Sequence, residues 1–366
     1  METGRLMGMA RSLLHGRRRD CLQAPARAAV LLLAAFLLAP ALLAAAPAGT
    51  GLQAVSDGAR KEGTLKLYAP STLGPRGAHL LQEGVKKKYG VDLNIAYTSS
   101  GSMTRDVAKV VTELAAGARP TWDIMLVTDA HYITLVENDF LERADYGALG
   151  IDPKAIVYDG AAVAYATQFV APAYNTQLIK PADVPKKWED LLDPKWKGKI
   201  GVSTATHHWG RLAQVWGDEK TTKYVRALAE QKIVRARLPE VYTRLQLGEV
   251  LIAATMTDSH IDEAKEKGAP IGFIEAVEPI IATHYLAAPL KGAEHKNAAL
   301  LLVAFLVSPE GQAIWGKEQG QTSMFAKGSP AYNYVQKKNA VSLEKKFALG
   351  RFEDLTNKYG KLLGFR

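Results

Sequence analysis

Residues 91–128 alternate between apolar and polar stretches in a regular order. A predicted strand (91–97) is followed by a polar loop (98–102), an amphipathic stretch and a second, apolar strand (122–127). The nearly continuous apolar run at 122–127 is typical of a parallel strand that is buried on both faces. The amphipathic stretch carries apolar residues at the spacing of one helix face, namely Val107, Val110, Val111 and Leu114. The pattern therefore predicts one right-handed βαβ unit.

Polar loops follow three predicted strands in this half of the chain. They span residues 70–74, 98–102 and 128–130, and each precedes a predicted helix. Because parallel strands end at one edge of a sheet, the loops are expected to meet at a ligand crevice. Free N–H groups at helix N-termini, together with hydroxyl groups, favour an anion there. The alternative is that a residue such as Ser102 or Asp129 only caps its helix. The candidate binding residues are Ser71, Thr72, Ser99, Ser100, Ser102 and Asp129.

The second half of the chain repeats the strand-loop-helix pattern. Residues 161–174 are apolar without helical periodicity, and the stretch is long enough to cross from one lobe to another. Strands are then predicted at 199–204 and 251–255, each followed by a polar loop and a helix. Two apolar stretches, at 271–277 and 280–290, are expected to return the chain to the first lobe before a helical C-terminus. The predicted fold class is α/β with two lobes.

The loops of the second lobe supply further candidates. One of two adjacent histidines and Trp209 are expected to give an organic anion a donor and an aromatic wall, the alternative being that Trp209 packs in the core. Arg211 either pairs bidentately with a carboxylate or phosphonate, or remains a solvated helix arginine. Asp258, like Asp129, either caps a helix or holds a ligand ammonium group. The candidates are Thr206, His207, His208, Trp209, Arg211 and Asp258.

Residues 1–48 have the order of an export signal: basic residues, an apolar stretch at 28–43, and small residues suited to cleavage. Retention as a membrane anchor is the alternative. Cys21, the only cysteine, lies in this segment, so the mature chain would form no internal disulfide and no thiolate metal site. The remaining lysines are scattered, which disfavours nucleic-acid binding. We expect a mature protein in the periplasm.

Two segments carry a family resemblance, YNTQLIKPADVPKKWEDLLDPKWKGKIGV (174–202) and VAFLVSPEGQAIWGKEQGQTSMF (303–325). They resemble the ferric-iron-type periplasmic solute-binding proteins of ABC importers (extracellular solute-binding protein family 1), a group that also holds phosphonate and thiamine binders. The resemblance implies a type-II periplasmic binding protein, with two lobes joined by two crossing strands and the ligand held between them. The predicted parts are a signal peptide (1–48), a first lobe (49–168), a second lobe (169–274), and the return to the first lobe with the C-terminal helices (275–366).

The resemblance also implies how iron-binding members hold Fe(III), with two adjacent tyrosines from a second-lobe loop, because phenolate oxygens are hard donors. The matching loop here is LIAATMTDSH (251–260), and no Tyr-Tyr pair occurs anywhere in the chain. Asp258 and His260 are a poor substitute for that pair. Iron bound in this way is therefore not expected, nor is any other metal site or cofactor.

The function expected from these observations is capture of a small, anionic solute by hinge closure and its delivery to an ABC permease. We expect the protein to act as a monomer. Two alternatives remain, a receptor that reports its ligand to a membrane signalling partner and a secreted α/β enzyme. The motifs of serine hydrolases, P-loop NTPases and zinc peptidases are absent, so an enzyme is not expected.

Overall fold

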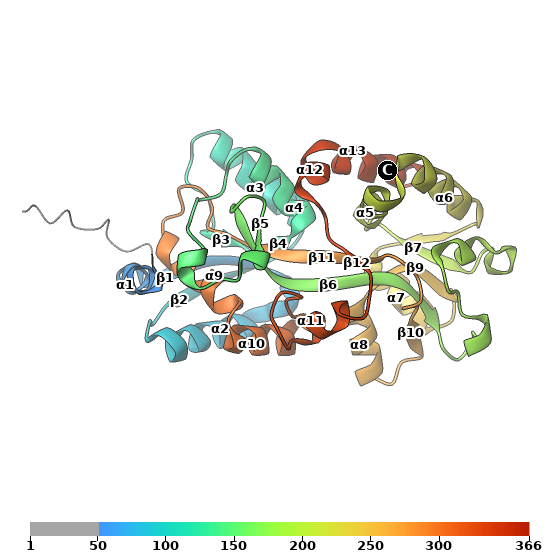
Figure 1. The fold of residues 1–366 in the computed structure, drawn as a ribbon, viewed down its shortest axis with the longest axis horizontal. Coiled ribbons are helices and arrows are strands. Elements are labelled where there is room, and N and C mark those ends of the chain that lie inside the picture. Colours follow the sequence, from blue (N-terminus) through green and yellow to red (C-terminus); the bar gives the residue numbers. More distant parts are fainter. Residues whose placement is uncertain (1–50, 366) are drawn as a thin grey trace, which may run out of the picture. The chain divides into compact units, whose positions relative to one another are not determined.

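The protein is described here by a computed structural model that covers residues 51–365 (Figure 1). The export signal predicted for residues 1–48 lies outside the described residues. The described chain forms a three-stranded sheet and a nine-stranded sheet, with helices packed against both. The α/β class predicted from the sequence is confirmed.

The three-stranded sheet forms the centre of the first lobe. Its strands are parallel in the order β2-β1-β3. The predicted βαβ unit is present, although its first strand begins at Asn94 rather than at residue 91. The elements are β1 (Thr64–Ala69), α2 (Gly74–Tyr89), β2 (Asn94–Ser99), α3 (Met103–Ala115) and β3 (Ile124–Met125).

The single strand predicted at 122–127 is divided between the two sheets. The Leu126 N–H still donates to the Tyr68 carbonyl oxygen of β1 (2.8 Å). The next two residues form β4 (Val127–Thr128), which pairs antiparallel with β11 (Ile280–Ala287) in the other sheet. Because the chain changes partners here, α4 (Asp129–Glu137) begins at the junction of the two sheets.

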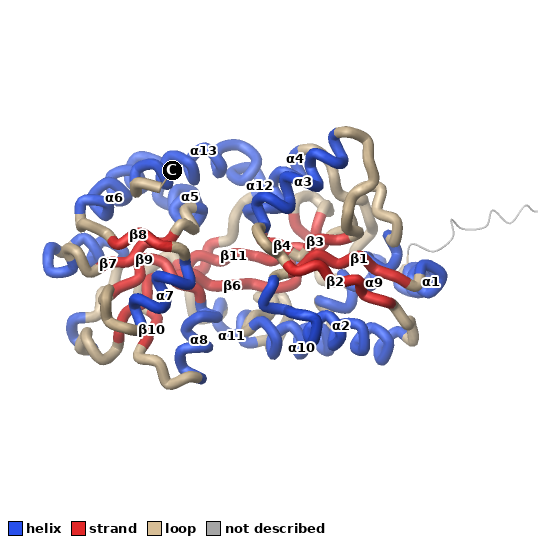
Figure 2. The backbone as a smooth tube through the Cα atoms, turned by 180° about the vertical axis from the view of Figure 1, so that it is seen from behind, coloured by secondary structure: helices blue, strands red, loops and turns tan. Residues whose placement is uncertain are grey.

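Two strands of the nine-stranded sheet cross between the lobes. The 14-residue strand β6 (Ala162–Asn175) pairs with β11 along residues 163–170. Farther along, at residues 170–174, it pairs with β9 (Ile252–Thr257). Figures 1 and 2 show β6 and β11 side by side between two groups of helices. The two-lobed fold with two crossing strands is therefore confirmed.

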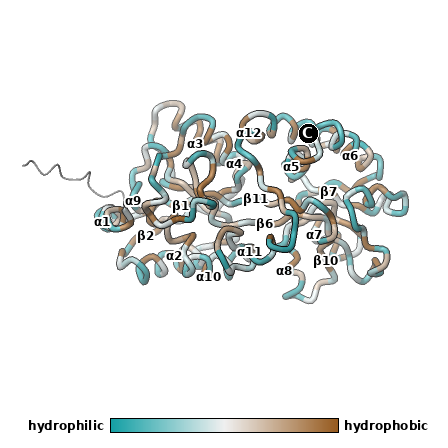
Figure 3. Tube along the Cα trace, in the orientation of Figure 1, coloured by the Kyte–Doolittle hydropathy of each residue, from teal (hydrophilic) through white to brown (hydrophobic). Residues whose placement is uncertain are grey.

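The second lobe is built around β9 and two parallel neighbours in the order β9-β7-β8. Its core contains the aromatic side chains of Trp188, Trp209 and Tyr224. Hydrophobic residues line the strands inside each lobe, and hydrophilic residues mark the outer helices and loops (Figure 3). The other elements are β7 (Ile200–Ser203), α5 (His207–Trp216), α6 (Asp218–Glu230), β8 (Val234–Ala236), α7 (Leu238–Gln246), α8 (Asp258–Glu266) and β10 (Ile271–Phe273).

The chain after β11 contributes helices to both lobes. Helix α9 (Lys296–Leu306) is buried in the first-lobe core between α1 (Leu52–Glu62) and α10 (Pro309–Gln319). The last helix, α13 (Glu353–Leu362), packs instead on α5 and α6. There the Lys358 ammonium and the Tyr359 hydroxyl donate to Asp218 (2.7 and 3.0 Å). The sequence analysis placed the C-terminal helices with the return to the first lobe (275–366) and did not predict that α13 contacts the second lobe. The boundaries of the four predicted parts of the chain stay predictions.

Four short elements complete the strands and α-helices: β5 (Ile156–Val157), α11 (Pro330–Val335), β12 (Ala340–Val341) and α12 (Lys345–Phe347). Within residues 51–365 no single helix is long and apolar enough to cross a membrane. Taken together, α9 and α10 reach that length and composition, but the pair is bent by 81°.

Candidate functional site

A cavity of about 600 Å³ lies where the starts of α3, α4 and α5 come together, and we call it the cleft cavity. Both lobes line it, since α3 and α4 belong to the first lobe and α5 to the second. The C-terminal segment at 352–357 also lines it. Its polar side chains are hydroxyls, imidazoles, one amide and one carboxylate, from Thr104, Thr112, His131, Thr134, Thr204, Thr206, His207, Glu353, Thr356 and Asn357.

His131 is held in this cavity by hydroxyl groups on both ring nitrogens. Its Nδ1 lies 2.7 Å from the Thr128 hydroxyl, and its Nε2 lies 3.3 Å from the Thr104 hydroxyl. Burial lowers the pKa of His131 to about 4 and also lowers the pKa of His207. Both imidazoles are therefore neutral at pH 7. The threonine hydroxyls engage both nitrogens of His131, so it is the His207 ring that offers a solute one donor and one acceptor.

A buried ion pair between Arg211 and Asp129 lies beside the cleft cavity. The Arg211 Nη2 donates to Asp129 Oδ1, and both side chains are almost fully buried. The guanidinium also lies 5.2 Å from the centre of the Phe352 ring. The alternative of a solvated arginine is therefore wrong. The guanidinium already has an anion, the carboxylate of the other lobe.

The predicted cluster at the start of α5 separates into cavity and core. Thr206, at the N-cap position, and His207 line the cleft cavity. The side chain of His208 is buried, with its ring 4.4 Å from that of His207. Burial lowers the pKa of His208 to about 3. Trp209 is fully buried against Trp188, so the expected aromatic wall is wrong and its core alternative is correct.

The serine and threonine candidates of the first lobe line neither this cavity nor the one described next. Ser102 caps α3 by accepting a hydrogen bond from the Arg105 N–H (3.4 Å). The Tyr68 hydroxyl donates to the Ser100 hydroxyl (2.8 Å), and the Thr72 hydroxyl donates to Gln319 (2.6 Å). Ser71 and Ser99 are exposed. A binding role for these five residues stays a prediction.

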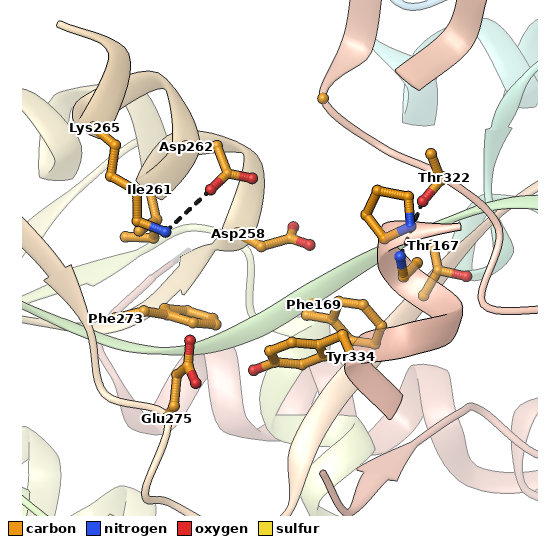
Figure 4. A pocket seen from close by; sticks show the side chains of 13 residues that line it. Thr167, Phe169, Asp258, Ile261, Asp262, Lys265, Phe273, Glu275, Thr322 and Tyr334 are labelled. Atoms are coloured by element: carbon orange, nitrogen blue, oxygen red, sulfur yellow. Dashed lines mark hydrogen bonds and ion pairs between the residues drawn. The ribbon is translucent and has the colours of Figure 1, made fainter. Parts of the chain in front are cut away.

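A second cavity, of about 160 Å³, lies between α8 and the segment at 320–334, and we call it the Asp258 cavity (Figure 4). The Asp258 carboxyl group points into it, with the rings of Phe169, Phe273 and Tyr334 along one side. Burial raises the pKa of Asp258 to about 7.

The N-cap positions of α4 and α8 are Thr128 and Thr257, so neither Asp129 nor Asp258 is the N-cap residue.

Sequence reasoning missed a repeated tetrapeptide, Thr-Asp-x-His, at 128–131 and 257–260. Both copies start a helix after a strand that pairs antiparallel with a crossing strand. In both, the threonine hydroxyl lies close to the histidine Nδ1, at 2.7 Å in the first copy and 2.6 Å in the second. This repeat was the available signal for His131, which was not among the predicted candidates.

No metal centre is evident in the part of the chain that the structure covers. Within residues 51–365, no group of three or more His, Cys, Asp or Glu side chains is placed to hold a metal ion. Asp258 and His260 have different contacts. The His260 Nδ1 lies close to the Thr257 hydroxyl, whereas Asp258 lines the Asp258 cavity.

A match to a protein family covers most of the chain. A family model described as bacterial extracellular solute-binding protein matches residues 83–341, which is more than half of the sequence. The chain belongs to the bacterial extracellular solute-binding proteins. The family resemblance of the two segments at 174–202 and 303–325 is thereby confirmed.

Relatives of this solute-binding protein are distant. The major ferric iron-binding protein of Neisseria meningitidis serogroup B is 26% identical over 149 residues, 38% of this chain and 45% of the relative. The chain thus spans about half the length of the curated relatives that it matches.

Two solved structures show the shared fold. Iron-bound HitA from Pseudomonas aeruginosa has a TM-score of 0.67 at 20% identity, covering 81% of this chain and 99% of that one. AfuA from Actinobacillus pleuropneumoniae, solved with exogenous fructose-6-phosphate bound, has a TM-score of 0.63 at 22% identity, covering 83% and 99%.

Proposed function

We propose that this protein is the periplasmic substrate-binding component of an ABC importer. It captures a small, anionic solute in the cleft cavity and presents it to the permease. Family membership supports the solute-binding role, and the fold supports capture by movement of two lobes about β6 and β11. The observation that carries the proposal is that side chains from both lobes, His131 and His207 among them, line one cavity.

The chemistry of the cleft cavity supports a hydroxylated anion. Helices α3, α4 and α5 begin at its wall, and the positive ends of their dipoles favour negative charge. The hydroxyls of Thr204 and Thr206 and the neutral imidazole of His207 suit the hydroxyl groups of a sugar. Fructose-6-phosphate, the molecule bound to AfuA, combines these features and is a suitable first probe.

Ferric iron, named for the Neisseria relative and for HitA, is less well supported as the solute of this chain. The loop at 251–260 offers Asp258 and Ser259 at the start of α8 and no tyrosine. An iron site on this loop would have to use a different donor set.

Native mass spectrometry of protein purified from the periplasm without refolding tests the proposal, because a tightly held solute survives purification. A stoichiometric bound mass that is lost in His207→Ala is expected. His79→Ala, which changes an exposed histidine of α2, is the matched control and should retain the bound mass. If neither a co-purified solute nor any added sugar phosphate binds, or if His207→Ala binds as tightly as the wild type, the assignment to the cleft cavity is wrong.

A further inference from the structure

The two Thr-Asp-x-His copies place their aspartates in matching surroundings. The Asp129 carboxylate accepts the N–H of the next residue, Ala130 (2.8 Å), and the N–H of His284 on crossing strand β11 (3.4 Å). The Asp258 carboxylate accepts the N–H of its next residue, Ser259 (2.9 Å), and that of Phe169 on crossing strand β6. Each carboxylate is thus fixed by its own helix start and by one crossing strand.

The two copies differ in the third partner. Asp129 is neutralised by the Arg211 guanidinium, which also lies over the Phe352 ring. Within residues 51–365, no lysine, arginine or histidine pairs with Asp258. The surroundings of Asp258 thus provide a carboxylate and aromatic rings, but no cationic side chain lies between them as Arg211 does beside Asp129.

The neighbouring charges do not compensate Asp258. Lys265, which lines the cavity, pairs with Asp262 (3.3 Å). Glu275, also at the cavity, pairs with Lys338 (3.2 Å). The positive and negative charges cancel within each of these two pairs, so the cavity retains the one negative charge of ionised Asp258. The raised pKa of Asp258 reflects this burial of an unpaired carboxylate.

The wall opposite the carboxylate suits an organic cation. The rings of Phe169 and Tyr334 lie 4.6 Å apart between centres, and Phe273 extends the aromatic surface. A cation over such rings is attracted by their electron-rich faces. The Tyr334 hydroxyl oxygen is buried and has no hydrogen-bond partner among the described residues, so it is an acceptor left for a bound N–H group. At about 160 Å³ the cavity holds far more than one water.

We infer that the Asp258 cavity binds the ammonium or guanidinium group of a small organic cation. The bound group sits between the Asp258 carboxylate and the aromatic rings, as the Arg211 guanidinium sits between Asp129 and Phe352. The cavity lies between α8 of the second lobe and residues 320–322, which follow α10 of the first, so a bound cation contacts both lobes. The site is separate from the cleft cavity, and the inference does not depend on the solute held there.

Calorimetric titration with butylammonium and butylguanidinium chloride tests the inference, with 1-butanol as a neutral probe of the same chain length and potassium chloride as an inorganic cation. Both organic cations should bind saturably at pH 8, and butanol and potassium should bind at least about tenfold more weakly. Equal binding of butanol would mean an apolar pocket only. Equal binding of potassium would mean a simple ion site. Either result, or no saturable binding of the organic cations, would overturn the inference.

Two variants locate the site. Asp258→Asn should weaken the binding of both cations at least about tenfold. Phe273→Leu should weaken the binding of the cations more than that of butanol. Glu263→Gln is the matched control, because it removes one negative charge from the exposed face of the same helix, where Glu263 pairs with Lys267. It should leave affinity within about twofold, as expected for a screened surface charge. Unchanged cation binding by Asp258→Asn would exclude this cavity, whereas His207→Ala, which tests the cleft cavity, should leave cation binding intact.

Discussion

The guanidinium of Arg211 and the carboxylate of Asp129 form a buried ion pair that joins the two lobes. Arg211 is 1% exposed and lies on α5 of the second lobe, while Asp129 is 2% exposed and starts α4 of the first. The pair lies beside the cleft cavity. Ala130, which follows Asp129, and His207, which lies about one helical turn before Arg211, both line that cavity. Its charges therefore position both walls of the cavity rather than contributing a free cation to it.

Arg211→Ala should lower the free energy of unfolding by about 3–5 kcal/mol, because it leaves Asp129 charged, buried and without its cation. Urea denaturation at pH 7 measures this change. The double variant Asp129→Asn, Arg211→Met removes both charges, so it should cost less than the sum of the two single changes.

Arg237→Ala provides the comparison for that experiment. Arg237 pairs with Glu240 on an exposed surface, where solvent screens the interaction, so this variant should be close to the wild type in stability. If Arg211→Ala is no more destabilised than Arg237→Ala, the pair between the lobes does not persist in solution.

Stability should fall as the pH is lowered from about 6.5 to 5. Burial holds the pKa of His131 and His284 at about 4 and that of His208 at about 3. In the unfolded chain these histidines titrate near about 6.5, so below that pH the unfolded state binds more protons. Asp258 acts in the opposite sense, because its raised pKa of about 7 lets the folded state hold a proton that the unfolded state has released.

Burial also lowers the pKa of His207 and His260, so at least three histidines against one carboxyl group leave two or more protons in favour of the unfolded state near pH 5. The free energy of unfolding should then fall by at least about 2.7 kcal/mol per pH unit. Asp258→Asn removes the opposing proton, so its stability should fall more steeply with acid than that of the wild type. Urea denaturation at pH 7.0, 6.0 and 5.0 compares the two. Equal slopes would show that Asp258 is not protonated in the folded state near pH 5.

The sequence predicted those parts of the fold that depend on local periodicity. The apolar face of α3 and the long apolar stretch that became β6 were both recognisable, because helical spacing and unbroken apolar runs reflect burial directly. The division of residues 122–127 between β3 and β4 was not recognisable, since it depends on β11, which lies more than 150 residues later.

The site was less predictable, because side-chain direction decides it. His207 and Trp209 are two residues apart on α5, yet one lines the cleft cavity and the other lies in the core. Successive helix residues point about 100° apart, so the mixed sequence around 207–211 did not fix the phase of the helix. The pairing of Arg211 with Asp129, 82 positions away, requires the two lobes to be placed together.

Ferric citrate should produce no visible charge-transfer band when it is added to the purified protein. Such a band needs phenolate oxygen bound to Fe(III), and the loop at 251–260 carries no tyrosine. The ring of Tyr242 lies 5.2 Å from that of the loop's His260 between centres, and burial raises the pKa of its phenol. Absorbance titration provides the measurement. A strong band at one equivalent of iron would contradict the prediction, and its loss in Tyr242→Phe would identify the donor.

Ser102→Ala should reduce stability rather than solute binding. The Ser102 hydroxyl accepts the Arg105 N–H at the start of α3, and loss of such a cap costs about 1 kcal/mol. The contact is long, at 3.4 Å, so a cost at the lower end of the usual range is expected. Thermal unfolding without solute reports this effect, and Ser99→Ala, at the exposed end of β2, is the control. Calorimetric titration with the co-purified solute reports the other role. If Ser102 instead holds an anionic solute, its affinity should drop by about tenfold or more while the unfolding temperature stays unchanged.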